Sequence, residues 1–111
     1  MAATPVKQTP NTPTETVEAR FHRFAAAWHR DTDYLSSMEA ADRHPAYQEI
    51  IGLGVEVVPL LLRDLAENHT HWFTALEAIT GAQPISAADA GNIPRMADAW
   101  LRWAKDNGYR W

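Results

Sequence analysis

The sequence predicts an all-α fold of four or five helices, on three observations. Apolar residues recur at spacings of three and four, which is the period of a helix face. Proline and glycine stand at the ends of these periodic segments, where helices begin and end. No segment has the alternation of apolar and polar residues that a half-buried strand requires. The chain has 111 residues, enough for one domain with a modest core.

The N-terminal part divides into a tail and a first helix. Residues 1–11 are rich in proline, threonine and small residues, so we expect a flexible tail followed by a single helical domain over residues 12–111. Thr12 is the expected N-cap, with Pro13 in the first helical position and Glu15 completing a capping box. The apolar residues that follow, at spacings of 4, 3 and 4, are Val17, Phe21, Phe24 and Trp28.

The helical pattern weakens around Asp31–Thr32–Asp33 and then resumes in phase. Two interpretations are open: one helix bends here, or a second short helix begins with Asp31 or Thr32 as its N-cap. We favour the break.

Proline and glycine then define a pair of helices. Pro45 opens a helix that Gly52 and Gly54 are expected to end, because glycine accepts the left-handed geometry of a helix terminus. Residues 55–67 are strongly apolar at helical spacing, and Pro59 lies near the first turn, where a missing N–H is least harmful. The sequence therefore predicts a helical hairpin.

Two further helices complete the prediction. One runs from about His71 to Thr80 with Gly81 as its stop, and residues 82–91 form a loop. The last helix runs from about Ile93 to Asn107 and carries tryptophans on one stripe. Most of the tryptophans lie on helical stripes, so we expect them in the core.

The words IIGLGVEVVPLLLRDL (residues 50–65) and ALEAITG (residues 75–81) resemble a HEAT-type helical repeat unit. The resemblance covers residues of about 45–81 and implies a HEAT-like antiparallel hairpin, closed by the N-terminal helix and the Trp-rich C-terminal helix. HEAT-like modules generally bind proteins and sometimes nucleic acid, which makes a binding role the expectation by analogy.

The whole chain also resembles a group of small, mostly uncharacterised bacterial proteins. The shared words are HPAYQEII from His44, HWF from His71, WLRW from Trp100, and the Gly108–Tyr109 pair. This resemblance implies a bacterial source and supplies no activity.

Composition narrows the function further. The formal net charge of −4 argues against nucleic acid as the main partner, because such proteins usually carry a basic face. The absence of cysteine excludes disulfides, thiolate zinc sites and a cysteine nucleophile. No apolar run reaches 18 residues, so we expect no membrane span and take the cytoplasm as the location.

The C-terminus carries the leading candidate for partner binding. Trp103, Tyr109 and Trp111 are aromatic, and Arg102 and Arg110 lie among them. An aromatic cluster with basic neighbours is typical of an interface anchor. It is also typical of a tail that seals the end of a small core, and the sequence leaves both interpretations open.

The alternative site lies at the start of the helix that Pro45 opens. His44, Tyr47 and Gln48 would form a small-ligand site or an enzymatic one, with His44 and Tyr47 as a proton-handling pair. The competing interpretation makes His44 a helix entry and Tyr47 a packed core residue. A third hypothesis, nucleic-acid binding, would use the basic residues Arg20, Arg23, His29, Arg30, Arg102 and Lys105.

The sequence predicts no catalytic residue, no metal site and no cofactor. His69 and His71 diverge by about 200° on a helix, and His22 and His29 lack a third ligand at a suitable spacing. We interpret the carboxylates, including those of Glu39 and Asp42, as solvated charges.

The function that these observations favour is a non-enzymatic protein–protein interaction module. A sharper version is an antitoxin or immunity protein that inhibits a cognate toxic enzyme. Homodimerisation is a further alternative, because a leftover apolar stripe on a helical hairpin can pack against a second copy.

Overall fold

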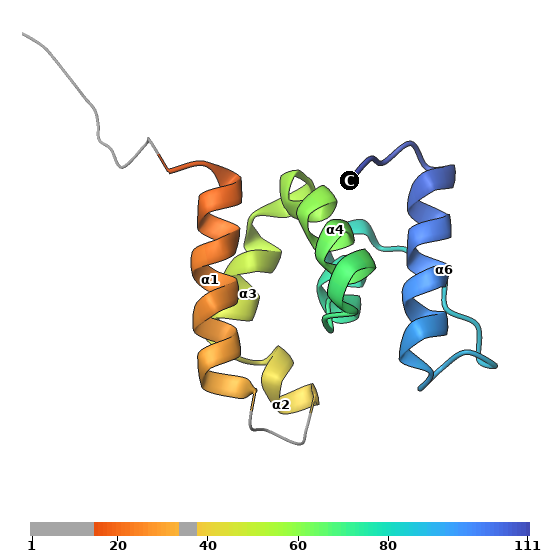
Figure 1. Ribbon diagram of the computed structural model, residues 1–111, viewed down its shortest axis with the longest axis horizontal. Helices are drawn as coiled ribbons and strands as arrows, with labels where there is room; N and C mark the ends of the chain where they lie inside the picture. The colour runs from red at the N-terminus through yellow and green to blue at the C-terminus, as the bar shows by residue number, and fades with distance from the viewer. Residues whose placement is uncertain (1–14, 34–37) are drawn as a thin grey trace, which may run out of the picture.

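The computed structural model describes residues 15–33 and 38–111, and this part of the chain is helical without any strand. The all-α prediction is therefore confirmed for the described residues. Figure 1 shows α1 at one end of the molecule, α3 and α4 in the middle and α6 at the other end. The elements are α1 (Val17–Thr32), α2 (Met38–Asp42), α3 (Pro45–Gly52), the 3₁₀ helix η3 (Gly54–Val57), α4 (Val58–Asn68), α5 (Phe73–Thr80) and α6 (Ile93–Asp106).

The start of α1 is capped by Thr16, whose hydroxyl accepts a hydrogen bond of 3.0 Å from the backbone N–H of Ala19. The expected caps at Thr12 and Pro13, and the expected tail over residues 1–11, lie outside the described residues. Glu15 forms two hydrogen bonds with the Arg23 guanidinium, of 2.7 and 2.8 Å, rather than serving within a capping box. The Arg23 hydrogen bonds lower the pKa of the Glu15 carboxyl below its ordinary value.

The predicted break is confirmed, because α1 ends at Thr32, Asp33 lies in a turn, and the next helix described, α2, starts at Met38. Asp31 and Thr32 are the last residues of α1, so the expectation that one of them caps the second helix is wrong. The Thr32 hydroxyl donates its hydrogen bond backwards to the carbonyl of Trp28 and therefore belongs to the helix that it ends.

The turn between α3 and α4 is longer than the sequence suggests. Gly52 remains within α3 and has no positive φ, so it does not end the helix as expected. Gly54, with φ of 76°, takes the left-handed geometry. A single 3₁₀ turn over residues 54–57 follows, and α4 begins at Val58 rather than Val55. The left-handed residue ends the α-helical ladder, and the tighter turn redirects the chain into α4.

The later helices end or begin at residues with left-handed or capping conformations. His69 takes a left-handed conformation with φ of 54° at the end of α4, and Gly81 ends α5 with φ of 74°. The Asn92 side chain caps α6 by accepting a hydrogen bond of 3.1 Å from the Arg95 backbone. The helix expected from His71 begins at Phe73, because His71 and Trp72 form the turn that precedes it.

The core is an aromatic cluster where α1 packs against α3 and α3 against α5. Trp28, Tyr47 and Trp72 are all buried, and each ring lies 4.9 to 5.5 Å from the other two. Phe21 adds a fourth ring, 5.5 Å from Trp72. This arrangement holds the N-terminal helices together, and it confirms that most of the large aromatic residues belong to the core.

A second part of the core lies between α4 and α6. Ala97, Trp100 and Ala104 of α6 are buried at helical spacing, whereas Met96 and Trp103, which the sequence placed on one stripe with Trp100, are half-buried against this core. Among the described residues, no helix combines the length and the apolar character that crossing a membrane requires.

Candidate functional site

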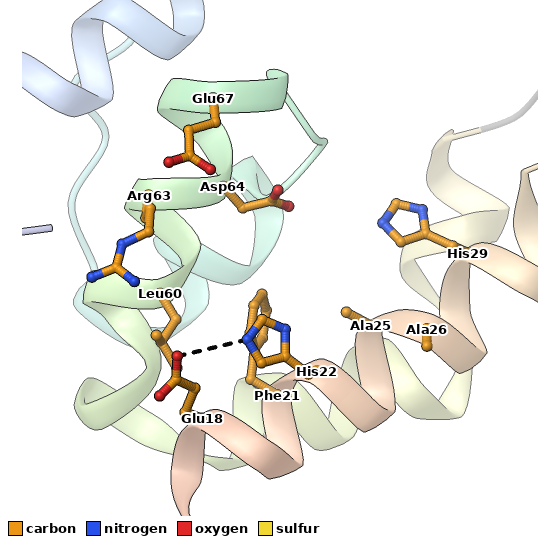
Figure 2. Close-up of a pocket in the computed structure, with 10 residues that line it drawn as sticks. All are labelled: Glu18, Phe21, His22, Ala25, Ala26, His29, Leu60, Arg63, Asp64 and Glu67. Carbon is orange, nitrogen blue, oxygen red and sulfur yellow. Dashed lines mark ion pairs between the residues drawn. The ribbon is translucent and has the colours of Figure 1, made fainter.

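A groove of about 290 Å³ lies between α1 and α4. Figure 2 shows α1 running along the base of this groove and α4 rising beside it. The lining residues are Glu18, Phe21, His22, Ala25, Ala26 and His29 of α1, and Leu60, Arg63, Asp64 and Glu67 of α4. Each set follows a spacing of three and four, so one stripe of each helix faces the groove.

The floor of the groove is apolar. Phe21 and Ala25 are buried, and Leu60 is half-buried against the core. Phe21 points from α1 toward Trp72 in the core. The next residue, His22, therefore lies on an adjoining face of α1 and is exposed at the edge of the groove. The groove therefore offers an apolar base with polar side chains above it, which is typical of a binding surface.

The rim carries three carboxylates, from Glu18, Asp64 and Glu67, against one guanidinium from Arg63. The Glu18 carboxylate lies 3.8 Å from His22 Nε2, and both side chains are exposed (Figure 2). With neutral histidines the rim is acidic, so it attracts a positively charged partner.

Among the charged side chains of the groove, the Asp64 carboxylate is held in place by hydrogen bonds from two neighbouring side chains. The carboxylate accepts hydrogen bonds of 2.7 Å from Trp72 Nε1 and 2.6 Å from Asn68 Nδ2. Burial is the largest single influence and raises the pKa of the Asp64 carboxyl. The hydrogen bonds from Trp72, Asn68 and Thr70 and the nearby His29 lower this pKa, and together they exceed the effect of burial. The pKa therefore lies below its ordinary value, and Asp64 is ionised at neutral pH.

The alternative site predicted at His44, Tyr47 and Gln48 is used for packing. His44 caps α3, because its Nδ1 accepts a hydrogen bond of 3.0 Å from the Ala46 N–H. Its Nε2 lies 2.9 Å from Asp31 Oδ2, and the His44 hydrogen bond is the main reason that the pKa of Asp31 is lowered. The Nδ1 atom must be unprotonated to accept, so Nε2 carries the proton. Nδ1 thus caps α3, and Nε2 ties the start of α3 to α1.

Tyr47 and Gln48 are engaged elsewhere. The buried Tyr47 hydroxyl donates to the carbonyl of His71 at 3.1 Å and accepts from the Ala75 N–H at 3.0 Å. Burial, followed by the charge of Asp42, raises the pKa of Tyr47, so its phenol stays protonated. Gln48 donates to the backbone carbonyl of Asp42 at 2.9 Å. The side chains of the three predicted residues therefore contact different partners, and only a backbone hydrogen bond of 3.2 Å, from the Gln48 N–H to the His44 carbonyl, joins two of them among the hydrogen bonds described.

The structure corrects the interpretation of Asp42 as a solvated charge, because this residue is buried. Its Oδ2 accepts a hydrogen bond of 2.6 Å from the Thr74 hydroxyl and lies 3.2 Å from His71 Nε2. The contacts of Asp42 with Thr74 and His71 could hardly be predicted from the sequence, since Asp42 and Thr74 are 32 residues apart. Only the packing of α2 beside α5 brings them together.

The predicted C-terminal anchor is partly folded onto α6. The Tyr109 ring stacks on Trp103 at 5.7 Å, and the Tyr109 N–H donates to the carbonyl of Ala104 at 2.9 Å. Trp111 remains 39% exposed, and the side chains of Arg102 and Arg110 are exposed. The structure thus leaves one aromatic ring and two guanidinium groups accessible at this edge.

No group of three or more histidine or acidic residues within the described ranges is arranged to hold a metal ion. Comparisons of the chain with protein-family models, with curated proteins and with solved structures give no match.

Proposed function

We propose that this protein is a non-enzymatic module that binds another protein, and that the groove between α1 and α4 receives a basic, partly apolar segment of that partner. The observation that carries the proposal is the combination of an apolar floor with an acidic rim in one groove. An antitoxin or immunity role is the special case in which the partner is a toxic enzyme.

The floor supplies the apolar part of the recognition. A side chain that covers Phe21, Ala25 and Leu60 would be removed from water without burying any unpaired polar group of the floor. The two helices hold these residues on rigid stripes, so little ordering is needed when the partner binds.

The acidic rim favours partners whose binding segment is positively charged. Glu18 of α1 and Glu67 of α4 are exposed on the rim, so each carboxylate is open to a lysine or arginine of the partner. Exposed pairs of this kind contribute modestly to affinity but strongly to the choice of partner and to the association rate. Acidic segments would be repelled by the same rim.

The exposed edge formed by Trp111, Arg102 and Arg110 is the second candidate surface for the same function. It differs from the groove in charge, because its basic residues favour an acidic partner. The two surfaces therefore make opposite predictions about the charge of the segment that binds.

The test uses two synthetic amphipathic peptides of equal length with the same leucine stripe. One has lysine on its polar face and the other has glutamate. We expect the lysine peptide to bind at least about tenfold more tightly, a difference of ~1.4 kcal/mol, by titration calorimetry at moderate salt. Spectral shifts of the Ala26 and His22 amides would place it in the groove.

A charge-matched pair of double variants provides the control. Glu18→Lys with Glu67→Lys reverses the rim, whereas Glu56→Lys with Asp98→Lys makes the same change in net charge outside the groove. Only the first pair should abolish the preference for the lysine peptide. Equal weakening by both pairs would show that net charge alone attracts the peptide. A preference for the glutamate peptide at Trp111 would move the site to the C-terminal edge.

A further inference from the structure

A second cavity, of about 350 Å³, lies between α5, the loop that follows it and α6. Its apolar walls are formed by Phe73, Ile85, Met96 and Trp100. Glu77 and Gln83, joined by a hydrogen bond of 2.7 Å between the amide and the carboxylate, form part of its polar edge. The volume falls in the usual range for small-molecule sites.

Two wall residues of this cavity carry buried polar atoms without a hydrogen-bond partner, Nε1 of Trp100 and Nδ1 of His71. Among the described residues, only one other buried side-chain atom, Asp42 Oδ1, is in the same state. An unpaired buried donor or acceptor costs about 1–3 kcal/mol, so a native structure normally satisfies such groups. Both residues line the same cavity, so an occupant that reaches these two atoms would supply the missing partners.

The chemistry of the two atoms defines that occupant. The Trp100 indole N–H can only donate, so it requires an acceptor. His71 Nε2 faces the Asp42 carboxylate at 3.2 Å, which places the proton on Nε2 and leaves Nδ1 as an acceptor. The occupant must therefore offer a donor to His71 as well.

We infer that this cavity binds a neutral, flat, aromatic small molecule that carries one carbonyl-type acceptor and one N–H or O–H donor. The aromatic side chains of Phe73 and Trp100 among the lining residues suit an aromatic body. The carboxylates of Glu77 and Asp42, close to the site, disfavour an anion. The site is distinct from the α1 groove, with which it shares no lining residue.

Neither unpaired atom reaches solvent, so an occupant must displace the surrounding side chains slightly to reach them. Met96 is the wall residue best suited to move, because it is only half-buried and its unbranched chain adopts many shapes.

The test uses 2-quinolinone and 4-quinolinone, which place the donor and acceptor on adjacent or opposite edges of the same ring system. Quinoline, which lacks the carbonyl and the N–H, is the control probe. The readout is the indole N–H resonance of Trp100, identified by its loss in Trp100→Phe. We expect one quinolinone to move this resonance downfield in a saturable manner, with a dissociation constant on the order of 0.1 mM. Quinoline should bind at least about tenfold more weakly than that quinolinone.

Two variants locate the binding. Met96→Trp should fill part of the cavity and abolish the shift, whereas Val55→Trp adds a tryptophan at an exposed position that does not line the cavity and should leave it unchanged. If Trp100→Phe fails to fold, the Met96 and Val55 pair still decides the result. The inference is overturned if neither quinolinone moves the Trp100 resonance, if quinoline binds equally well, or if Met96→Trp has no effect.

Discussion

The two ends of the molecule bury tryptophan in different ways. In the N-terminal core, Trp28 Nε1 donates to the carbonyl of Ala41 at 2.8 Å, and Trp72 Nε1 donates to Asp64 at 2.7 Å. In the C-terminal helix, Trp100 is equally buried but its indole N–H has no partner. Trp111, further along, is partly exposed.

This difference separates a structural role from a binding role. The hydrogen bonds of Trp28 and Trp72 join α1 to α2 and α4 to the turn before α5, so these rings hold helices in place. The unpaired N–H of Trp100 makes no such hydrogen bond, and a ligand that displaces the surrounding side chains could pair it. The buried indole N–H groups of the N-terminal core are thus paired within the fold, whereas that of Trp100 in α6 is not.

The largest expected effect comes from Trp72→Ala. The substitution removes a fully buried ring that contacts Phe21, Trp28 and Tyr47, and it takes from Asp64 one of its hydrogen bonds. We expect a loss of about 3–5 kcal/mol in the free energy of unfolding, measured by urea denaturation. A loss below about 1 kcal/mol would show that the aromatic cluster does not hold the N-terminal helices together.

Asp42→Ala should have the next largest effect. It removes the acceptor of Thr74 and the partner of His71, and so weakens the attachment of α2 to α5. We expect a loss of about 1.5–3 kcal/mol by the same measurement. Asp98→Ala, at an exposed position of α6, is the matched control and should change stability by less than about 0.5 kcal/mol. Equal effects of the two substitutions would contradict the role assigned to Asp42.

A pair of identical substitutions tests the comparison itself. Trp28→Phe and Trp100→Phe remove the same indole N–H from buried rings. The first leaves the carbonyl of Ala41 unpaired, whereas the second removes no hydrogen bond. We expect Trp28→Phe to be more destabilising than Trp100→Phe by about 1–2 kcal/mol. The comparison fails if the two variants unfold at the same urea concentration.

The smallest effect is a dependence of stability on acid pH through Asp64. Its pKa is lowered from an ordinary value of 3.8, so the unfolded chain binds the proton more readily than the folded one. The stabilisation is present above pH ~4 and is lost as the pH falls through the lowered value. Urea denaturation between pH 6 and pH 2, run on the native chain and on Asp64→Asn, measures it.

The native chain should therefore lose stability more steeply below pH ~4 than the Asp64→Asn variant does. Parallel pH profiles would mean that the Trp72 and Asn68 hydrogen bonds do not favour the ionised carboxylate.

Predictions that depend on neighbouring residues agree well with the structure. His44 and Pro45 open α3, Gly81 ends α5 and Asn92 caps α6, because caps and left-handed residues act through hydrogen bonds and dihedral angles within one turn. Misplaced boundaries, such as the start of α4 at Val58, arise where a 3₁₀ turn has the same apolar spacing as the helix that follows.

The candidate sites could be predicted only in part. The C-terminal aromatic residues and the role of His44 as a helix entry were accessible from sequence, because each depends on adjacent positions. The groove between α1 and α4 could not be predicted from the sequence. Glu18 and Glu67 lie 49 positions apart and share a rim only after α1 and α4 have packed.

The sequence by itself therefore determined the helical class, several helix ends and many of the apolar positions that form the core, because each is set by local periodicity and capping. The tertiary structure alone decided that Asp42 is buried, that the N–H of Trp72 is paired and that the N–H of Trp100 is not. Hydrogen-bond partners distant in sequence meet only when helices pack, and the burial that makes an unpaired group costly exists only in the folded chain.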